Sequence, residues 1–136
     1  MSINPPTILY VEDEPRSRRV MQLITTDMDV NSLTMFEDSE DFETRIGTLE
    51  PKPDLIFLDI HVRPLSGFDM LAVLRQSEAF KHTPIVAMTA SVMNEEIQQL
   101  RMAGFSGCLA KPIDMDTFPD SVFRIMNGEA IWHIAS

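Results

Sequence analysis

The stretch DLIFLDIHV, residues 54–62, reads as a buried β-strand that ends on a carboxylate and is followed by the loop RPLSG. Four large apolar residues in succession, 55–58, are typical of a strand buried on both faces of a parallel sheet. Burying an isolated carboxylate costs several kcal/mol. Asp59, at the end of this strand, is therefore expected either to cap the helix that follows or to take part in chemistry.

Short apolar runs of this kind alternate with stretches of helical spacing along the whole chain. The runs are TILYV (7–11), VNSLTMF (30–36), DLIFLD (54–59), TPIVAMTA (83–90) and GCLAK (107–111). Apolar residues three or four positions apart lie between the runs and after the last, beginning with Val20, Leu23 and Ile24. Five strands alternating with five helices predict an α/β fold, in which a parallel sheet is covered by helices on both faces.

Length and composition predict a single soluble domain. The chain has 136 residues, of which 44% are hydrophobic and 24% charged. No linker precedes residue 127, and Asn-Gly at 127–128 predicts a helix end. We therefore expect a domain over residues 1–127, with residues 128–136 forming a tail or the start of a linker.

Charge and cysteine content restrict the class of protein further. The net charge is −10, which argues against direct binding to nucleic acids or to anionic membranes. Cys108 is the only cysteine, so no internal disulfide can form, which suits a reducing cytoplasm. The sequence has no leader-like segment and no apolar run long enough to span a membrane. We expect a cytoplasmic protein that acts through protein contacts.

Polar side chains follow four of the predicted strands. They are Glu12, Asp13 and Glu14 after the first strand, Asp59 after the third, Thr89 after the fourth and Lys111 after the fifth. The carboxyl ends of parallel strands are where ligands bind in such folds, because the loops into the helices begin there. The sequence therefore predicts a site at this edge of the sheet.

The electrostatics of this edge favour a divalent cation. Two carboxylates about 5 Å apart repel each other by about 3 kcal/mol at an effective dielectric constant near 20. Lys111 compensates only one of the charges carried by Glu12, Asp13 and Asp59. Oxygen ligands without a thiolate or imidazole cluster select Mg²⁺ or Mn²⁺ over zinc. Thr89 and Lys111 offer donors to a phosphoryl group, and Asp59 is a plausible nucleophile towards phosphorus.

These segments together resemble the receiver domain of two-component response regulators, CheY-like proteins of phosphorelay signalling. The segments are YVEDE, LIFLDI, PLSGFDML, PIVAMTA and CLAKPI, in this order and at strand ends, and the resemblance runs from Thr7 to Met126. It implies a flavodoxin-like strand order 2-1-3-4-5. It also implies a signalling switch rather than a conventional enzyme, one that promotes only its own phosphotransfer and slow self-dephosphorylation.

The resemblance assigns a role to each residue of the metal site. Asp13 would bind Mg²⁺ directly and Glu12 through water. Asp59 would be the second carboxylate ligand, and the backbone carbonyl of His61 the third protein ligand.

The resemblance also assigns the phosphoryl chemistry. Asp59 would accept a phosphoryl group from a histidine kinase or a histidine phosphotransfer protein, Thr89 would hydrogen-bond this group, and Lys111 would form an ion pair with it. A cis bond between Lys111 and Pro112 is implied as well. Self-association, if it occurs, would use the face formed by the fourth helix, the fifth strand and the fifth helix.

Three positions depart from the family pattern. Arg63 replaces a proline four residues after Asp59, with Pro64 following it, and His61 places a bulky side chain close to the phosphoacceptor. Cys108 stands where an aromatic residue usually changes rotamer together with the strand-four Thr. Because Cys108 is too small to fill that space, we expect weak coupling between phosphorylation and the face named above.

Three alternatives remain open from the sequence. Asp59 could simply cap the third helix. A phosphatase of the haloacid dehalogenase type would need a second Asp two residues after the nucleophile, and His61 occupies that position. A receiver-like module that signals without phosphorylation would usually lack the acidic pair or the Asp, both of which are present.

Overall fold

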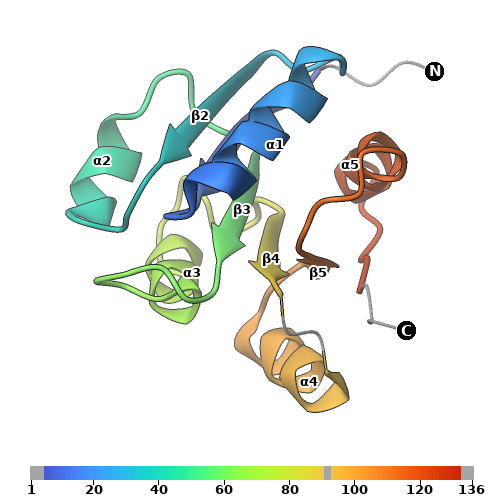
Figure 1. Cartoon of the computed structure of the whole chain (residues 1–136). Coiled ribbons are helices and arrows are strands. Elements are labelled where there is room, and N and C mark those ends of the chain that lie inside the picture. Colours follow the sequence, from blue (N-terminus) through green and yellow to red (C-terminus); the bar gives the residue numbers. More distant parts are fainter. Residues whose placement is uncertain (1–4, 91–92, 133–136) are drawn as a thin grey trace.

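A computed structural model of the protein describes residues 5–90 and 93–132 (Figure 1). The strands are β1 (Thr7–Val11), β2 (Ser32–Phe36), β3 (Leu55–Asp59), β4 (Ile85–Thr89) and β5 (Gly107–Ala110). The helices are α1 (Pro15–Thr26), α2 (Phe42–Thr48), α3 (Gly67–Arg75), α4 (Asn94–Ala103) and α5 (Phe118–Met126). The ends of the predicted domain and tail, residues 1–4 and 133–136, lie outside the described residues.

The five strands form one parallel sheet in the order β2-β1-β3-β4-β5. Helices α1 and α5 cover one face of the sheet, and α2, α3 and α4 cover the other (Figure 1). The predicted three-layer architecture and the strand order 2-1-3-4-5 are confirmed. In the part of the chain that the structure describes, none of the helices is both long and apolar enough to cross a bilayer.

Alternation of side chains along the strands creates two cores. Ile8 and Tyr10 on β1 pack in the layer of α1 and α5, whereas Leu9 and Val11 pack against the other three helices. Strands β1, β3 and β4 are buried along their whole length. Burial on both faces explains why these segments read as uninterrupted apolar runs.

One residue of the predicted buried face of α1, Leu23, is exposed, whereas Ile24 is buried and Val20 packs against the core. The side chain of Leu23 is 56% exposed, whereas Met21, Ile24 and Thr25 are buried. Spacing at positions i, i+3 and i+4 defines a helical stripe, but neighbouring stripes can share residues. Here the stripe that faces the sheet includes a threonine, whose hydroxyl is satisfied by the backbone carbonyl of Met21 at 2.8 Å. A prediction from the spacing of apolar residues therefore selected Leu23 and missed the buried Thr25.

The C-terminal segment packs against the edge of the sheet. The backbone N–H of Cys108 donates to the carbonyl of Ile131 at 2.7 Å, and Trp132 pairs with Cys108 in a parallel bridge. A Cβ atom on Gly107 would lie 2.6 Å from the Ile131 carbonyl oxygen, so only glycine allows this approach. Ile131 is buried, and the guanidinium of Arg101 lies 4.8 Å from the centre of the Trp132 ring. Ile131 and Trp132, in the segment whose role the sequence left open, thus cover the outer edge of β5.

Ile131→Ala is expected to lower the free energy of unfolding by about 2 kcal/mol. This is the lower end for a buried isoleucine, because a terminal segment can detach rather than leave a cavity. Urea denaturation followed by fluorescence of Trp132, the only tryptophan, measures the effect. The matched control is Leu23→Ala, at an exposed position, which should change stability little. Equal midpoints for Ile131→Ala and wild type would show that the segment does not contribute to folding.

Candidate functional site

The carboxyl edge of the sheet brings together all the strand-end residues singled out from the sequence. Glu12 and Asp13 follow β1, Asp59 ends β3 in the centre of the sheet, Thr89 ends β4, and Lys111 follows β5. The backbone N–H of Lys111 donates to the carbonyl of Thr89 at 2.9 Å, which holds the start of its loop beside β4.

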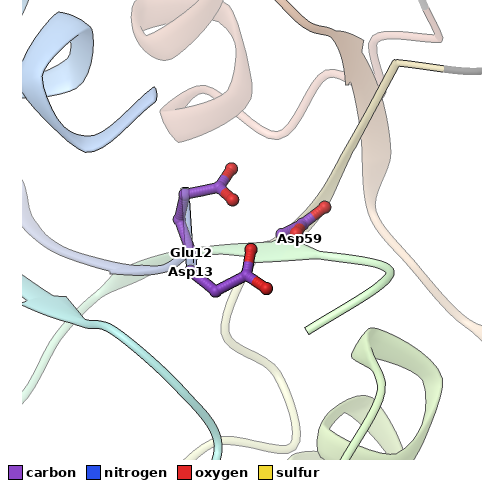
Figure 2. A group of neighbouring side chains, drawn as sticks. All are labelled: Glu12, Asp13 and Asp59. Carbon is purple, nitrogen blue, oxygen red and sulfur yellow. The ribbon is translucent and has the colours of Figure 1, made fainter. Parts of the chain in front are cut away.

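Three carboxylates converge at this edge (Figure 2). One oxygen from each of Glu12, Asp13 and Asp59 lies within 4.8 Å of the other two. Glu12 and Asp59 are buried, whereas Asp13 is exposed and opens the cluster to solvent. With Lys111 as the ammonium, the four side chains retain two negative charges. A cluster of carboxylate oxygens with excess negative charge fits Mg²⁺ or Mn²⁺.

Glu12 has no exposed surface and accepts three hydrogen bonds through its side chain. Its Oε1 atom accepts from the Tyr10 hydroxyl at 2.8 Å and from the Lys111 ammonium at 2.9 Å. Its Oε2 atom accepts from the backbone N–H of Glu14 at 3.1 Å. Burial, followed by the charge of Glu12 and the hydrogen bond to it, raises the pKa of the Tyr10 phenol far above its ordinary value. Tyr10 is therefore a neutral donor to Glu12.

Lys111 is shared unequally between two carboxylates. Its Nζ atom lies 2.9 Å from Glu12 Oε1 and 3.5 Å from Asp59 Oδ1. Partial burial would lower the pKa of the ammonium, but the hydrogen bond to Glu12 and the charges of Asp59, Glu12 and Glu14 outweigh this effect and raise the pKa. Lys111 is therefore fully charged at neutral pH, and its direct hydrogen bond goes to Glu12 rather than to Asp59.

Asp59 does not cap the helix that follows it. Helix α3 is capped by Ser66, whose hydroxyl accepts from the backbone N–H of Asp69, while the Asp69 carboxylate accepts from the backbone N–H of Ser66. This is a complete capping box. The Asp59 carboxylate instead faces Lys111, so helix capping does not explain a buried carboxylate at this position.

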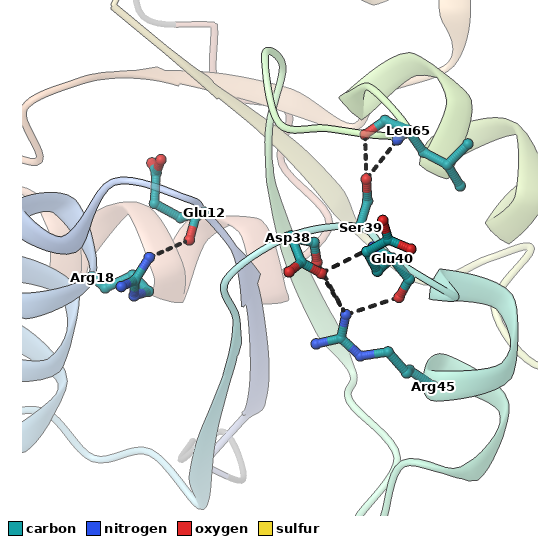
Figure 3. Close-up of polar contacts among 7 residues, drawn as sticks. All are labelled: Glu12, Arg18, Asp38, Ser39, Glu40, Arg45 and Leu65. Atoms are coloured by element: carbon teal, nitrogen blue, oxygen red, sulfur yellow. Dashed lines mark hydrogen bonds and ion pairs between the residues drawn. The ribbon is translucent and has the colours of Figure 1, made fainter.

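The loop between Asp59 and α3 is held closely at both sides. Gly67 lies against the end of β3, where an added Cβ atom would approach the Asp59 carbonyl oxygen to 3.1 Å. On the other side, the buried hydroxyl of Ser39 donates to the Leu65 carbonyl at 2.7 Å and accepts from the Leu65 N–H at 2.6 Å (Figure 3). The backbone N–H of Ser39 also donates to the Arg63 carbonyl at 3.1 Å. The loop that carries the Arg63 departure is thus fixed by the β2–α2 connection.

Arg45 and Arg18 complete the supports around the edge (Figure 3). Arg45 Nη1, on α2, donates to the Asp38 carboxylate at 3.0 Å and to the Glu40 carbonyl at 2.9 Å, which orders the loop around Ser39. Arg18 Nη1, on α1, donates to the backbone carbonyl of Glu12 at 2.9 Å. Of the three arginines on α1, Arg18 turns towards the site, while Arg16 and Arg19 are exposed.

Thr89 and His61 line a cavity next to the acidic cluster. The cavity has a volume of about 360 Å³, and Phe68, Glu96 and Gln99 also line it. Thr89 is buried, whereas His61 is exposed. The bond from Lys111 to Pro112 is cis, as the resemblance implied.

The side chain of Cys108, at the position that the resemblance gives to a switching aromatic residue, lies in the interior. It is fully buried in the core on the side of α2, α3 and α4, and Trp132 packs against the same core. Burial, with a smaller contribution from the charge of Glu96, raises the pKa of the thiol to about 11. The thiol is therefore protonated and unreactive at neutral pH.

Sequence reasoning missed Tyr10 and Ser39. The alternation of strand residues could have indicated Tyr10, because it lies two positions before Glu12 and thus on the same side of the chain. No local pattern indicates Ser39, since its partner Leu65 belongs to another loop.

Sequence comparison matches the chain to one protein family and to curated relatives. A family model described as the response regulator receiver domain matches residues 8–123. The polar-differentiation response regulator DivK of Brucella anthropi is 25% identical over 118 residues, which cover 87% of this chain and 94% of DivK.

Two solved structures show the same fold. Chemotaxis response regulator CheY4 of Vibrio cholerae superposes with a TM-score of 0.79 at 21% identity, covering 89% of this chain and 98% of CheY4. The receiver domain of sensor histidine kinase PA1611 from Pseudomonas aeruginosa, with a magnesium ion coordinated in its active-site cleft, gives a TM-score of 0.76 at 22% identity. That match covers 92% of this chain and 99% of the PA1611 domain.

Proposed function

The chain belongs to the response regulator receiver domain family of two-component signalling, and from this membership we propose that it is a phosphorylation-activated switch. Asp59 accepts the phosphoryl group from a histidine kinase or a histidine phosphotransfer protein. The observation that carries this proposal is the Asp59 side chain, which is 5% exposed, does not cap α3 and lies with its carboxylate 3.5 Å from the Lys111 ammonium. The unpaired Cys108 suits a reducing cytoplasm.

The transfer is a displacement at phosphorus. A carboxylate oxygen of Asp59 forms the new P–O bond as the P–N bond of the phosphohistidine breaks. The electron pair of that bond returns to the imidazole nitrogen. Lys111 and Thr89 supply an ammonium and a hydroxyl to the phosphoryl oxygens, where negative charge must be stabilised.

The carboxylate cluster is proposed to hold Mg²⁺, with Mn²⁺ as a substitute. Asp13 and Asp59 would bind the cation directly, Glu12 through water, and His61 through its backbone carbonyl. The cation neutralises charge on the cluster and on the phosphoryl oxygens. The magnesium ion in the cleft of the PA1611 receiver domain supports this assignment.

Asp13→Asn is expected to remove most of the stabilisation by Mg²⁺. In the wild type, Mg²⁺ at ten times its dissociation constant should add about 1.4 kcal/mol to the free energy of unfolding. Thermal unfolding with and without MgCl₂ measures the difference. Asp29→Asn, at an exposed site just before β2, serves as the control and should respond as the wild type does. Equal Mg²⁺-dependent shifts in Asp13→Asn and wild type would contradict the site.

The output is proposed to be a changed protein surface. Thr89 and Cys108 occupy the two switch positions, and the buried, small Cys108 supports weak coupling between the phosphoryl group and the face of α4, β5 and α5. Trp132 and Ile131 already cover the edge of β5. A homodimer through this face would therefore need the C-terminal segment to move or to take part in the contact.

Two other functions receive less support. For a phosphatase of the dehalogenase type, the position of the second Asp is taken by His61, whose side chain is exposed. A module independent of phosphorylation would not need the cluster formed by Glu12, Asp13 and Asp59. The cluster favours the phosphorylated switch over both.

Incubation with acetyl phosphate and Mg²⁺ tests the proposal. We expect intact-mass spectrometry to show one added phosphoryl group, labile to hydroxylamine as acyl phosphates are. Beryllofluoride with Mg²⁺ should shift the NMR signals of residues around Asp59 and Thr89. Sustained phosphate release from a generic phosphomonoester would instead indicate an enzyme, and no modification together with no spectral shift would indicate an unphosphorylated module.

A further inference from the structure

Tyr10 holds a hydroxyl against the buried carboxylate of the acidic cluster. Tyr10 and Glu12 lie two residues apart at the end of β1, so their side chains project to the same side. The Tyr10 hydroxyl donates to Glu12 Oε1 at 2.8 Å, and both residues are fully buried. The ring packs edge-on against Phe57, with centroids 6.5 Å apart, and Phe57 packs against Phe118. These contacts fix the position from which the hydroxyl donates.

Glu12 Oε1 also accepts a hydrogen bond from the Lys111 ammonium, which the proposed switch requires at Asp59. Lys111 Nζ lies 2.9 Å from Glu12 Oε1 and 3.5 Å from Asp59 Oδ1. Under the proposed function, on which this inference rests, a phosphoryl group on Asp59 becomes the partner of Lys111. Glu12 would then lose its only cationic hydrogen-bond donor among the described side chains while remaining buried. Removing the cation from a buried carboxylate is strongly unfavourable unless other donors remain on its oxygens.

We propose that Tyr10 is a positioning residue that keeps Glu12 in place when Lys111 passes from Glu12 to the phosphoryl group on Asp59. With Lys111 displaced, Glu12 Oε1 keeps the Tyr10 hydroxyl and Oε2 keeps the N–H of Glu14. Both oxygens of the buried carboxylate therefore retain one donor. Without the hydroxyl, Lys111 would be the only donor to Oε1 among the described protein groups, and the ammonium would be held more strongly on Glu12.

Tyr10→Phe removes the hydroxyl and retains the packing of the ring. With saturating Mg²⁺, we expect its affinity for beryllofluoride to fall about tenfold, the lower end for loss of a hydrogen bond to a charged group. Its affinity for Mg²⁺ alone should stay close to that of the wild type, because without beryllofluoride Lys111 still donates to the Glu12 carboxylate. A purely structural role for Tyr10 would not separate the two affinities. NMR titration measures both.

Two further variants sharpen the comparison. In a Glu12→Gln background, Tyr10→Phe should change beryllofluoride affinity by less than about twofold, because the residue that accepts from the Tyr10 hydroxyl is no longer charged. Thr25→Val removes another buried hydroxyl, near the C-terminal end of α1, and should leave beryllofluoride affinity unchanged. In the wild type, the NMR signal of the Tyr10 hydroxyl proton should persist and shift when beryllofluoride binds, which tests the contact even if Tyr10→Phe does not fold.

The outcomes distinguish the role of Tyr10 from the proposed phosphorylation-activated switch. A wild type that responds to beryllofluoride, with Tyr10→Phe binding it equally well, would overturn the role of Tyr10 and leave the proposed function intact. Equal losses of Mg²⁺ and beryllofluoride affinity in Tyr10→Phe would also overturn the role of Tyr10. A wild type that ignores beryllofluoride in the presence of Mg²⁺ would overturn both.

Discussion

Asp59→Asn is expected to abolish phosphorylation by acetyl phosphate. An amide has no anionic oxygen to form a bond with phosphorus, and the other carboxylates of the cluster are committed to other partners or to solvent. Glu12 accepts three hydrogen bonds and is fully buried, and Asp13 is exposed to solvent. Intact-mass spectrometry after incubation with acetyl phosphate and Mg²⁺ should show no added phosphoryl group.

The control for this experiment is Asp120→Asn. The side chain of Asp120 is 71% exposed on α5, so its replacement should leave labelling at the level of the wild type. Undiminished labelling of Asp59→Asn, or a wild-type modification that resists hydroxylamine, would mean that another residue accepts the phosphoryl group.

Lys111→Met is expected to lower the free energy of unfolding by about 3 kcal/mol in the absence of Mg²⁺, because it leaves buried carboxylates without their cation. The side chains of Glu12 and Asp59 are 0% and 5% exposed, so water cannot replace the ammonium well. The folded-state pKa of Lys111 is raised above its ordinary value of 10.5. Its contribution to stability is therefore complete below that pH and is lost only as the pH rises through the folded pKa.

Mg²⁺ should restore part of this loss. In Lys111→Met, no ammonium or guanidinium of the described residues forms an ion pair with the three carboxylates, so Mg²⁺ should stabilise the variant more than it stabilises the wild type. Beryllofluoride should nevertheless shift the NMR spectrum of the variant weakly, because the ammonium that pairs with the phosphoryl group is absent. Urea denaturation with and without MgCl₂ measures the first effect.

Lys81→Met provides a matched control for the charge. Lys81 pairs with Glu78 at 3.0 Å, a distance like that between Lys111 and Glu12, but both side chains are largely exposed. Exposed pairs of this kind contribute about 0.2–1 kcal/mol. A Lys111→Met variant no less stable than Lys81→Met would contradict the burial argument, as would equal responses of Lys111→Met and wild type to Mg²⁺.

Local patterns in the sequence were enough to predict the helices, the strands and their arrangement in layers. The uninterrupted apolar runs of β1, β3 and β4 match strands that are buried along their whole length. Helical spacing placed five helices correctly, although it selected Leu23 instead of Met21 for the buried face of α1. Such patterns succeed because strand and helix periodicities arise within a few residues of the chain.

The sequence also determined which residues gather at the carboxyl edge. Asp59, Thr89 and Lys111 could be placed there because parallel strands all end on the same side of the sheet. Their strand-end positions follow from chain order alone. The resemblance to receiver domains supplied the strand order, which alternation by itself does not specify.

Only the tertiary structure decided how these residues divide their hydrogen bonds. Lys111 donates to Glu12, Ser39 clamps Leu65, and Ile131 closes on Cys108. Each contact joins segments from different parts of the chain. Each also depends on these segments being placed relative to one another to within a few tenths of an ångström. Periodicity determines which way a side chain faces, whereas the choice among several donors within reach depends on packing, which no local stretch of sequence encodes.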